Sequence, residues 1–271
     1  MSIERRLHPL LVPLLLAMAL PAVVQARSWL LPSLTVLPDP GWITVDAATS
    51  DEYFFLNRGP LGVETLNISA PDGTRVEPQN SSSGKLRNSF DVQLTQTGTY
   101  RITVTSDSIN ASYEDNGARK RFRGTSEEFT KQVPAGATKL EVWQNQQRVE
   151  TFITARKPSV GALKSSGIGL ELQPVTHPND LYAGETAKFR FTLDGKPAAG
   201  VEVSIIPGGT RHRDNPNETV IKADTNGEVS FTWPRAGWYL LEASAKDVPP
   251  SIPQAQQRNA LYTTTLEVLP Q

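Results

Sequence analysis

Hydrophobic and polar residues alternate along many short segments of the chain, which is the pattern of β-strands with one buried face. Two of these segments share a motif in which glycine, any residue and tyrosine are followed by alternating apolar positions. They are QTGTYRITV at 96–104 and RAGWYLLEA at 235–243. A tyrosine near the start of a late strand is typical of immunoglobulin-like sandwiches. The two copies therefore predict two sandwich modules in tandem.

Further segments with alternating or β-branched residues predict additional strands. They are WITVDAA at 42–48, LEVWQNQQRVETFI at 140–153, KFRFTL at 188–193, VEVSII at 201–206, EVSFTW at 228–233 and TTTLEVL at 263–269. We interpret the stretch 140–153 as two strands or one bulged strand. A helix is predicted only at 125–133, where Thr125 and Glu128 have the spacing of a capping box. The expected fold class is all-β.

The predicted domain boundaries follow from where the strand patterns begin and end along the chain. Arg5 and Arg6 precede an apolar run and then small residues at Val24 and Ala26, which predicts a cleaved secretory signal peptide at 1–26. We expect an N-terminal β-sandwich at 27–155, a linker rich in Gly, Ser and Lys at 156–169, and an immunoglobulin-like or prealbumin-like β-sandwich at 170–271. No later segment has the length of a membrane span.

Composition narrows the classes of function. The chain has no cysteine, three histidines and a net charge of −1, so disulfides and thiolate metal sites are excluded and nothing indicates nucleic-acid binding. The sequence lacks a Gly-x-Ser-x-Gly elbow, a phosphate-binding loop and a His-Glu-x-x-His motif. We therefore expect a protein that is not an enzyme, with a hydrolase of unrecognised carboxylate site as a third hypothesis.

The segment VTHPNDLYAGE, at 175–185, is the candidate metal site. His177, Asp180 and Glu185 offer an imidazole and two carboxylates, which suit zinc, copper, nickel or iron. The alternative is a structural role, because Asn-Asp and Gly residues in this stretch also favour turns.

Two further clusters are candidate surfaces for a partner or ligand. Tyr53, Phe54 and Phe55 form an aromatic run that could line a pocket, although burial in the core is the alternative. Arg121 and Arg123 belong to a basic stretch that could hold an anion, although charges beside an Asn-Gly hairpin can also form a solvated face.

Several strings together resemble an exported bacterial family catalogued as a domain of unknown function. The strings are RSWLLPS, ITVDAATSDEYFF, RFRGT, VETFIT, ELQPVTHPNDLYAGE and DGKPAAGVEV followed by IIPGGTRHRD. Some members of that family are described as periplasmic components of nickel and cobalt transport systems. The resemblance implies a non-enzymatic periplasmic protein with immunoglobulin-like domains.

This chain also departs from the family pattern in two places where family members tend to carry histidine. Family members often begin the mature chain with His, whose imidazole and α-amine could chelate a metal, but Arg27 stands at the matching position and cannot ligate. The loop after the aromatic run tends to carry His in the family, whereas this chain has Asn57 and Arg58. His177 matches the family's His-Pro-Asn-Asp-Leu pattern.

The leading functional hypothesis is therefore a periplasmic accessory or binding protein for transition-metal uptake, with nickel, cobalt, copper or iron as the possible metal. Its expected partners are a metal-uptake transporter or an outer-membrane receptor. The alternative is a structural module that binds a protein or a glycan and no metal.

Overall fold

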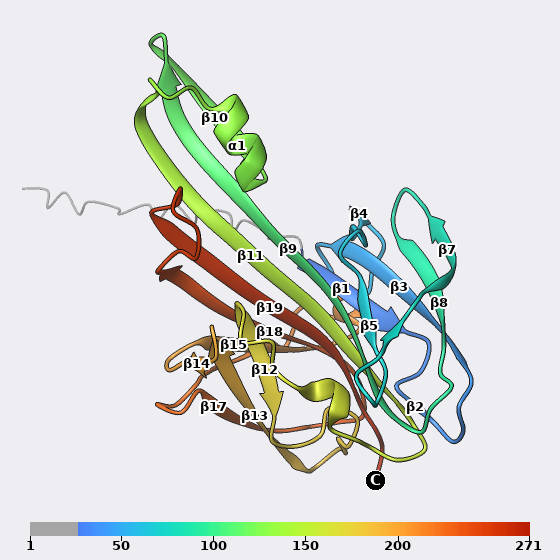
Figure 1. Cartoon of the computed structure of the whole chain (residues 1–271). Coiled ribbons are helices and arrows are strands. Elements are labelled where there is room, and N and C mark those ends of the chain that lie inside the picture. Colours follow the sequence, from blue (N-terminus) through green and yellow to red (C-terminus); the bar gives the residue numbers. More distant parts are fainter. Residues whose placement is uncertain (1–26) are drawn as a thin grey trace, which may run out of the picture.

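The predicted all-β fold is confirmed. The computed structural model describes residues 27–271, in which nineteen strands are accompanied by one α-helix of seven residues and two 3-10 turns, η1 (Gly161–Leu163) and η2 (Thr210–His212). The predicted signal peptide at 1–26 lies outside the described residues. Within 27–271, no helix is long and apolar enough to cross a membrane. Three sheets, A, B and C, contain all nineteen strands (Figure 1).

Sheet A has five strands in the order β1–β3–β8–β7, with β4 beside β3, and every pairing is antiparallel. Its strands are β1 (Arg27–Pro32), β3 (Trp42–Ser50), β4 (Gly59–Pro60), β7 (Gln79–Ser83) and β8 (Asn88–Gln93). Ile43, Val45 and Ala47 alternate along β3 and are buried on one face, as the period of two requires.

Sheet B is the ten-stranded sheet through the middle of the molecule. Its order is β16–β15–β18–β19–β11–β9–β5–β6, with β10 beside β9 and β2 beside β11. Its strands are β2 (Val36–Leu37), β5 (Asn67–Ser69), β6 (Arg75–Val76), β9 (Gly98–Asp115), β10 (Ala118–Gly124), β11 (Thr138–Ala155), β15 (Glu202–Pro207), β16 (Thr219–Lys222), β18 (Gly237–Val248) and β19 (Gln257–Val268). β11 is one strand of eighteen residues with a register shift between Thr138 and Glu141, so the bulged alternative is the correct one.

Sheet C has four strands, with β12 and β17 on either side of β13 and a short β14 also paired to β13. They are β12 (Leu170–Pro174), β13 (Thr186–Leu193), β14 (Lys196–Pro197) and β17 (Glu228–Thr232).

Two hydrophobic cores lie on opposite faces of sheet B. Ile153 of β11 packs with Val45 and Phe90 of sheet A, whereas the adjacent Phe152 packs with Phe189 and Phe191 of sheet C. Neighbouring residues in a strand point to opposite faces, so sheets A and C cover different sides of sheet B. The two cores share β11, and β11 pairs in parallel with β19 of the C-terminal half.

The two Gly-x-Tyr motifs adopt the same local structure. Gly98 and Gly237 have φ angles of 131° and 135°, which glycine adopts readily. The Tyr100 hydroxyl accepts hydrogen bonds from the Thr95 and Gln96 amides, at 2.9 and 2.7 Å. The Tyr239 hydroxyl donates to the Arg235 carbonyl at 2.8 Å. Each tyrosine therefore ties the start of its strand to the preceding turn.

A long hairpin extends beyond the two cores (Figure 1). It consists of the outer parts of β9 and β11 together with β10, and α1 (Ser126–Gln132) packs against it. Thr125 and Glu128 form the predicted capping box, and Phe129 of the helix meets Phe122 of β10 with ring centroids 5.6 Å apart. This small third core supports the projecting hairpin.

The segment 156–169, predicted as a linker, is held by hydrogen bonds to both halves. Ser159 donates its amide to Thr99 Oγ1 at 3.0 Å, and Ser165 and Ser166 donate to Glu171. The predicted module boundaries stay a prediction, because sheet B continues from one core to the other.

Candidate functional site

The candidate site is a polar groove on the part of sheet B that sheet A leaves uncovered. Along one face of β9, the alternate residues are apolar from Tyr100 to Val104, where they form the N-terminal core. On the same face they then become Ser106, Ser108 and Asn110, which line the groove. The change from apolar to polar residues marks the edge of the covered region.

Neighbouring strands extend this polar face. Asn145 and Gln147 of β11 lie opposite Ser108 and Ser106 of β9, and Asn259 of β19 lies opposite Asn145. With residues of β15 and β18 they enclose a groove of about 580 Å³. Hydroxyl and amide groups from five neighbouring strands of sheet B therefore form one continuous surface.

Arg27 and Glu242 line the groove on the side nearest sheet A, and Arg27 also pairs with Glu218. The Arg27 Nε lies 3.3 Å from Glu242 Oε2, and its Nη2 lies 3.6 Å from Glu218 Oε1. Burial raises the pKa of Glu242, and Glu218 raises it further, while the Arg27 charge opposes both. Arg27, which replaces the expected histidine, is thus the counter-ion of a largely buried carboxylate.

A second hollow of about 500 Å³ continues the groove along the projecting hairpin. Asn110 and Arg123 line both hollows. Arg121 and Trp143 line the second one, and the indole Nε1 of Trp143 donates to Gln257 Oε1 at 3.2 Å. Arg121 and Arg123, singled out as candidates from the sequence, are exposed and lie on the same face of β10.

Two buried polar atoms along the groove have no hydrogen-bond partner among residues 27–271. They are Asn110 Oδ1 and Asn145 Nδ2. Buried polar groups in proteins are nearly always paired, because an unpaired one loses its hydration without compensation. The groove thus offers one acceptor and one donor to a ligand.

His177, the candidate metal ligand, is engaged in a structural hydrogen-bond network. Its Nδ1 accepts from the Asn179 amide at 3.1 Å, which leaves Nε2 as the protonated nitrogen. Nε2 lies 3.2 Å from the Ser159 carbonyl and 2.9 Å from Thr99 Oγ1. Nε2 therefore connects the 177–179 turn to Thr99 of the N-terminal half, whereas Nδ1 closes the turn itself.

We expect the contribution of His177 to stability to depend on pH. Burial lowers the pKa of His177 from its ordinary value of 6.5, although the hydrogen bond to Ser159 and the charge of Asp180 oppose that shift. The fold favours the neutral imidazole, so the contribution is complete above about pH 6.5 and declines as the pH falls below it. Urea unfolding of the wild type and His177→Gln should show a larger difference at pH 7.5 than at pH 5. A difference that grows on acidification would contradict this assignment.

Asp180 and Glu185 do not join His177 in a metal-binding group. Both residues are exposed, and their hydrogen bonds are made by the main chain: Asp180 donates its amide to the His177 carbonyl, and Glu185 donates its amide to the Tyr182 carbonyl. Within the described part of the chain, no three His, Cys, Asp or Glu side chains are grouped so as to hold a metal ion.

The aromatic run at 53–55 connects the two halves of the molecule. Tyr53 is buried, so it belongs to a core and not to an exposed surface. The Phe54 ring lies 5.7 Å from Trp29 and 6.5 Å from Trp238. Phe55 is covered by the Arg211 guanidinium, 4.3 Å from its centroid. These residues join the loop after β3 to the C-terminal half.

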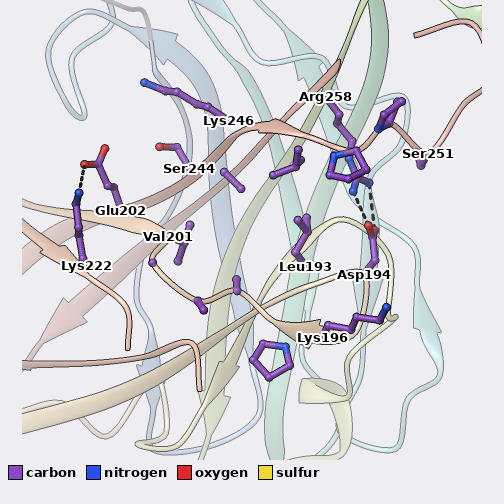
Figure 2. A pocket seen from close by; sticks show the side chains of 18 residues that line it. Leu193, Asp194, Lys196, Val201, Glu202, Lys222, Ser244, Lys246, Ser251 and Arg258 are labelled. Atoms are coloured by element: carbon purple, nitrogen blue, oxygen red, sulfur yellow. Dashed lines mark hydrogen bonds and ion pairs between the residues drawn. The ribbon is translucent and has the colours of Figure 1, made fainter. Parts of the chain in front are cut away.

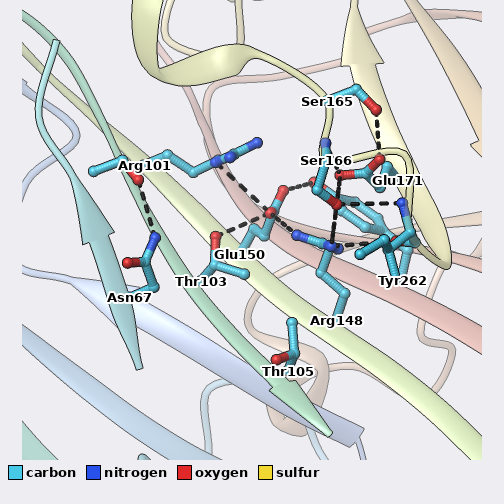
Figure 3. Close-up of polar contacts among 12 residues, drawn as sticks. Asn67, Arg101, Thr103, Thr105, Arg148, Glu150, Ser165, Ser166, Glu171 and Tyr262 are labelled. Atoms are coloured by element: carbon cyan, nitrogen blue, oxygen red, sulfur yellow. Dashed lines mark hydrogen bonds and ion pairs between the residues drawn. The ribbon is translucent and has the colours of Figure 1, made fainter. Parts of the chain in front are cut away.

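A buried charged cluster lies on the opposite side of sheet B (Figure 3). Glu150, 2% exposed, accepts hydrogen bonds from Thr103 at 3.0 Å and from the Tyr262 hydroxyl at 2.9 Å. Arg148 lies between Glu150 and Glu171, with nitrogen–oxygen distances of 3.2 and 3.5 Å. All these groups have partners, so the cluster joins the strands and leaves no charge free for chemistry.

Another hollow, of about 710 Å³, lies at the end of the C-terminal half (Figure 2). Arg258 is 2% exposed and pairs with Asp194 in a two-pronged contact, at 3.2 and 2.5 Å. The hydrogen bond from Arg258 lowers the pKa of Asp194, which burial alone would raise. Prolines and alanines form much of the remaining wall. The charged pair holds the 194–195 turn onto β19 and brings together no group of reactive side chains.

Most residues of the groove were not predicted from the sequence. The signal was present in TYRITVTSDSINASYED at 99–115, where the apolar residues change from one face of the strand to the other halfway along. Such a change indicates that a different layer covers each half of the strand. Glu242 and Asn259 carried no local signal, because only the strand order of sheet B brings them to the groove.

Comparisons with solved structures return distant likenesses. The D0–D1 domain of intimin is 14% identical over 89% of this chain and 97% of that chain, with a TM-score of 0.23. The adhesin InvE of Yersinia pseudotuberculosis is 13% identical over 90% and 60%, with a TM-score of 0.22. The adhesin FdeC of Escherichia coli is 12% identical over 91% and 65%, with a TM-score of 0.24. TM-scores this low support no inference about function.

A comparison with family models confirms the expected family, as a domain of unknown function. No curated protein matches the chain. A family model does match, over residues 24–247, and this range includes Arg27, the groove residues of β9 and β11, and Glu242. The chain therefore belongs to the family described as domain of unknown function DUF4198.

Proposed function

We propose that this chain is an exported, non-enzymatic binding protein that assists transition-metal uptake through its polar groove. The groove is the observation that carries the proposal, because it combines an open polar surface with buried atoms that lack partners. The link to metal uptake comes from the resemblance to periplasmic proteins of nickel and cobalt transport. An uptake transporter or an outer-membrane receptor is the expected partner.

In this proposal the protein acts as an accessory and not as the carrier of the metal. Both ring nitrogens of His177 are already hydrogen-bonded, and the described residues hold no grouped set of three ligands. At the family's N-terminal histidine position, Arg27 carries a fixed positive charge that repels cations. The same observations favour the second candidate, a protein-binding or glycan-binding module with no connection to metals.

A deletion strain distinguishes the two candidates. We expect loss of the protein to lower cell-associated nickel or cobalt during metal-limited growth, measured by mass spectrometry of washed cells. The wild type and His177→Gln should restore the metal content, whereas Arg121→Ala combined with Arg123→Ala should not. Arg75→Ala is the matched control, because Arg75 is an exposed arginine on a different part of sheet B. Unchanged metal content in the deletion strain would reject the uptake role.

Titration of the purified protein with metal ions tests whether the protein is an accessory or carries the metal itself. We expect nickel, cobalt, copper and zinc to give the same weak calorimetric response with the wild type and with His177→Ala. At about 100 μM protein, a millimolar site gives little signal. A stoichiometric site that His177→Ala removes would make the protein a metal carrier and contradict the accessory role.

A further inference from the structure

We propose that the polar groove binds an acidic oligosaccharide, with the sugar hydroxyls on its floor and the carboxylates on the arginines of β10. This inference rests on the proposed binding role of the groove and is independent of the link to metal uptake.

The floor of the groove has the hydrogen-bonding pattern that a polyhydroxylated ligand requires. Asn110 Oδ1 is an unpaired acceptor, and Asn145 Nδ2 is an unpaired donor. A sugar hydroxyl can donate and accept at the same time, so one ligand can satisfy both atoms. Ser106 and Ser108 add hydroxyls between these amides.

Trp143 supplies an apolar surface at the outer end of the groove. It is half-buried, it lies opposite Asn110 in the strand register, and its Nε1 is already bound to Gln257. With its polar end occupied, the indole presents mainly its apolar ring to a ligand. Flat apolar surfaces beside a few directed polar groups are typical of small-molecule binding sites, and the carbon face of a sugar ring fits such a surface.

The charges of the groove favour an acidic ligand over a neutral one. At the inner end, the carboxylates already have basic partners: Glu242 lies beside Arg27, and Glu202 lies 3.6 Å from Lys222. At the outer end, Arg121 and Arg123 are exposed and form no ion pair with residues 27–271. A guanidinium binds a carboxylate with two parallel hydrogen bonds, so this end provides specific anion recognition.

The strand arrangement favours a glycan over an extended acidic peptide. Extended peptides commonly bind by adding a strand to a free sheet edge. In the groove, β11 lies between β9 and β19, and residues 109–115 of β9 lie between β10 and β11, so the backbone groups of these segments are already paired. Around Asn110 and Asn145 the floor therefore offers side chains only, which suits a ligand that is recognised through its hydroxyls.

Calorimetry with three probes tests the proposal. We expect oligogalacturonate to bind the wild type more tightly than cellohexaose of similar length, and polyglutamate to give no measurable binding. Arg121→Ala, Arg123→Ala and Asn145→Ala should each weaken oligogalacturonate binding by about tenfold, the usual effect of losing a charge-assisted or buried hydrogen bond. Arg75→Ala should leave the affinity unchanged. Added salt should weaken binding through the arginines.

Specific outcomes would overturn the proposal. They are no heat with oligogalacturonate at millimolar concentration, equal affinity for polyglutamate, equal affinity for cellohexaose, or an equal effect of Arg75→Ala. Thermal unfolding of each variant checks that the fold is retained. Cell-associated metal is measured separately from glycan binding. Unchanged metal content would reject the uptake role without affecting the glycan result, and absence of glycan binding would leave the uptake role untouched.

Discussion

Replacing Glu150 by alanine should lower the free energy of unfolding by about 3–5 kcal/mol, the usual cost of removing one member of a buried charged group. Glu150 is 2% exposed, and it accepts hydrogen bonds from Thr103, Tyr262 and Arg148. Its loss leaves the Arg148 side chain, which is only 12% exposed, beside Glu171 alone. It also leaves the Tyr262 hydroxyl, whose pKa burial raises well above its ordinary value, without an acceptor.

Two variants make this prediction specific. Glu150→Gln keeps the shape but replaces one acceptor oxygen by a donor, so about 1–3 kcal/mol is expected. Glu77→Ala removes an exposed carboxylate that pairs with Arg75, and it should cost less than about 1 kcal/mol. Urea unfolding followed by tryptophan fluorescence measures all three. A loss below about 1 kcal/mol for Glu150→Ala would show that the cluster adds little to stability.

Local sequence patterns predicted the strands well because their causes are local. KFRFTL falls within β13, and EVSFTW overlaps β17 except for its last residue. The capping box at Thr125 and Glu128 formed as expected, because both hydrogen bonds lie within four residues. The paired glycine and tyrosine motifs were informative for the same reason, since each tyrosine binds the backbone of its own preceding turn.

Features that depend on strand order could not be predicted in this way. β11 pairs in parallel with β19, so Trp143 lies opposite Gln257, 114 positions later in the chain. No local pattern encodes the pairing of β11 with β19. This pairing joins the strands of the N-terminal half to those of the C-terminal half within sheet B. The segment 156–169, predicted as a linker, is hydrogen-bonded to Thr99 of β9 and to Glu171 of β12, and no local pattern encodes these contacts either.

The candidate residues differ in how much of their role could be predicted from the sequence. Arg121 and Arg123 were found because a basic strand is visible in the sequence, and they do line a hollow. His177 drew attention as a rare imidazole in a family string, but the structure gives both of its ring nitrogens hydrogen-bond partners within the chain. Whether a histidine is free to ligate depends on those partners, and they come from Ser159 and Asn179.

Replacing Tyr239 by alanine should lower the free energy of unfolding by about 3–5 kcal/mol, as expected for a large buried aromatic residue. The Tyr239 ring is 1% exposed and lies edge-on to Trp233, with centroids 4.9 Å apart. The substitution creates a cavity in the C-terminal core and also removes the hydrogen bond to the Arg235 carbonyl. The loss should therefore combine a packing contribution and a polar one.

Tyr239→Phe separates these two contributions, because it keeps the ring and removes only the hydroxyl. We expect it to cost about 1 kcal/mol, the typical net value of one hydrogen bond. Trp42→Ala is the matched surface control, since Trp42 is 51% exposed, and its effect should stay within about 1 kcal/mol. The measurement is urea unfolding at pH 7.5. If Tyr239→Phe costs as much as Tyr239→Ala, the hydroxyl and not the ring stabilises this corner, and the assignment of Tyr239 as a core residue fails.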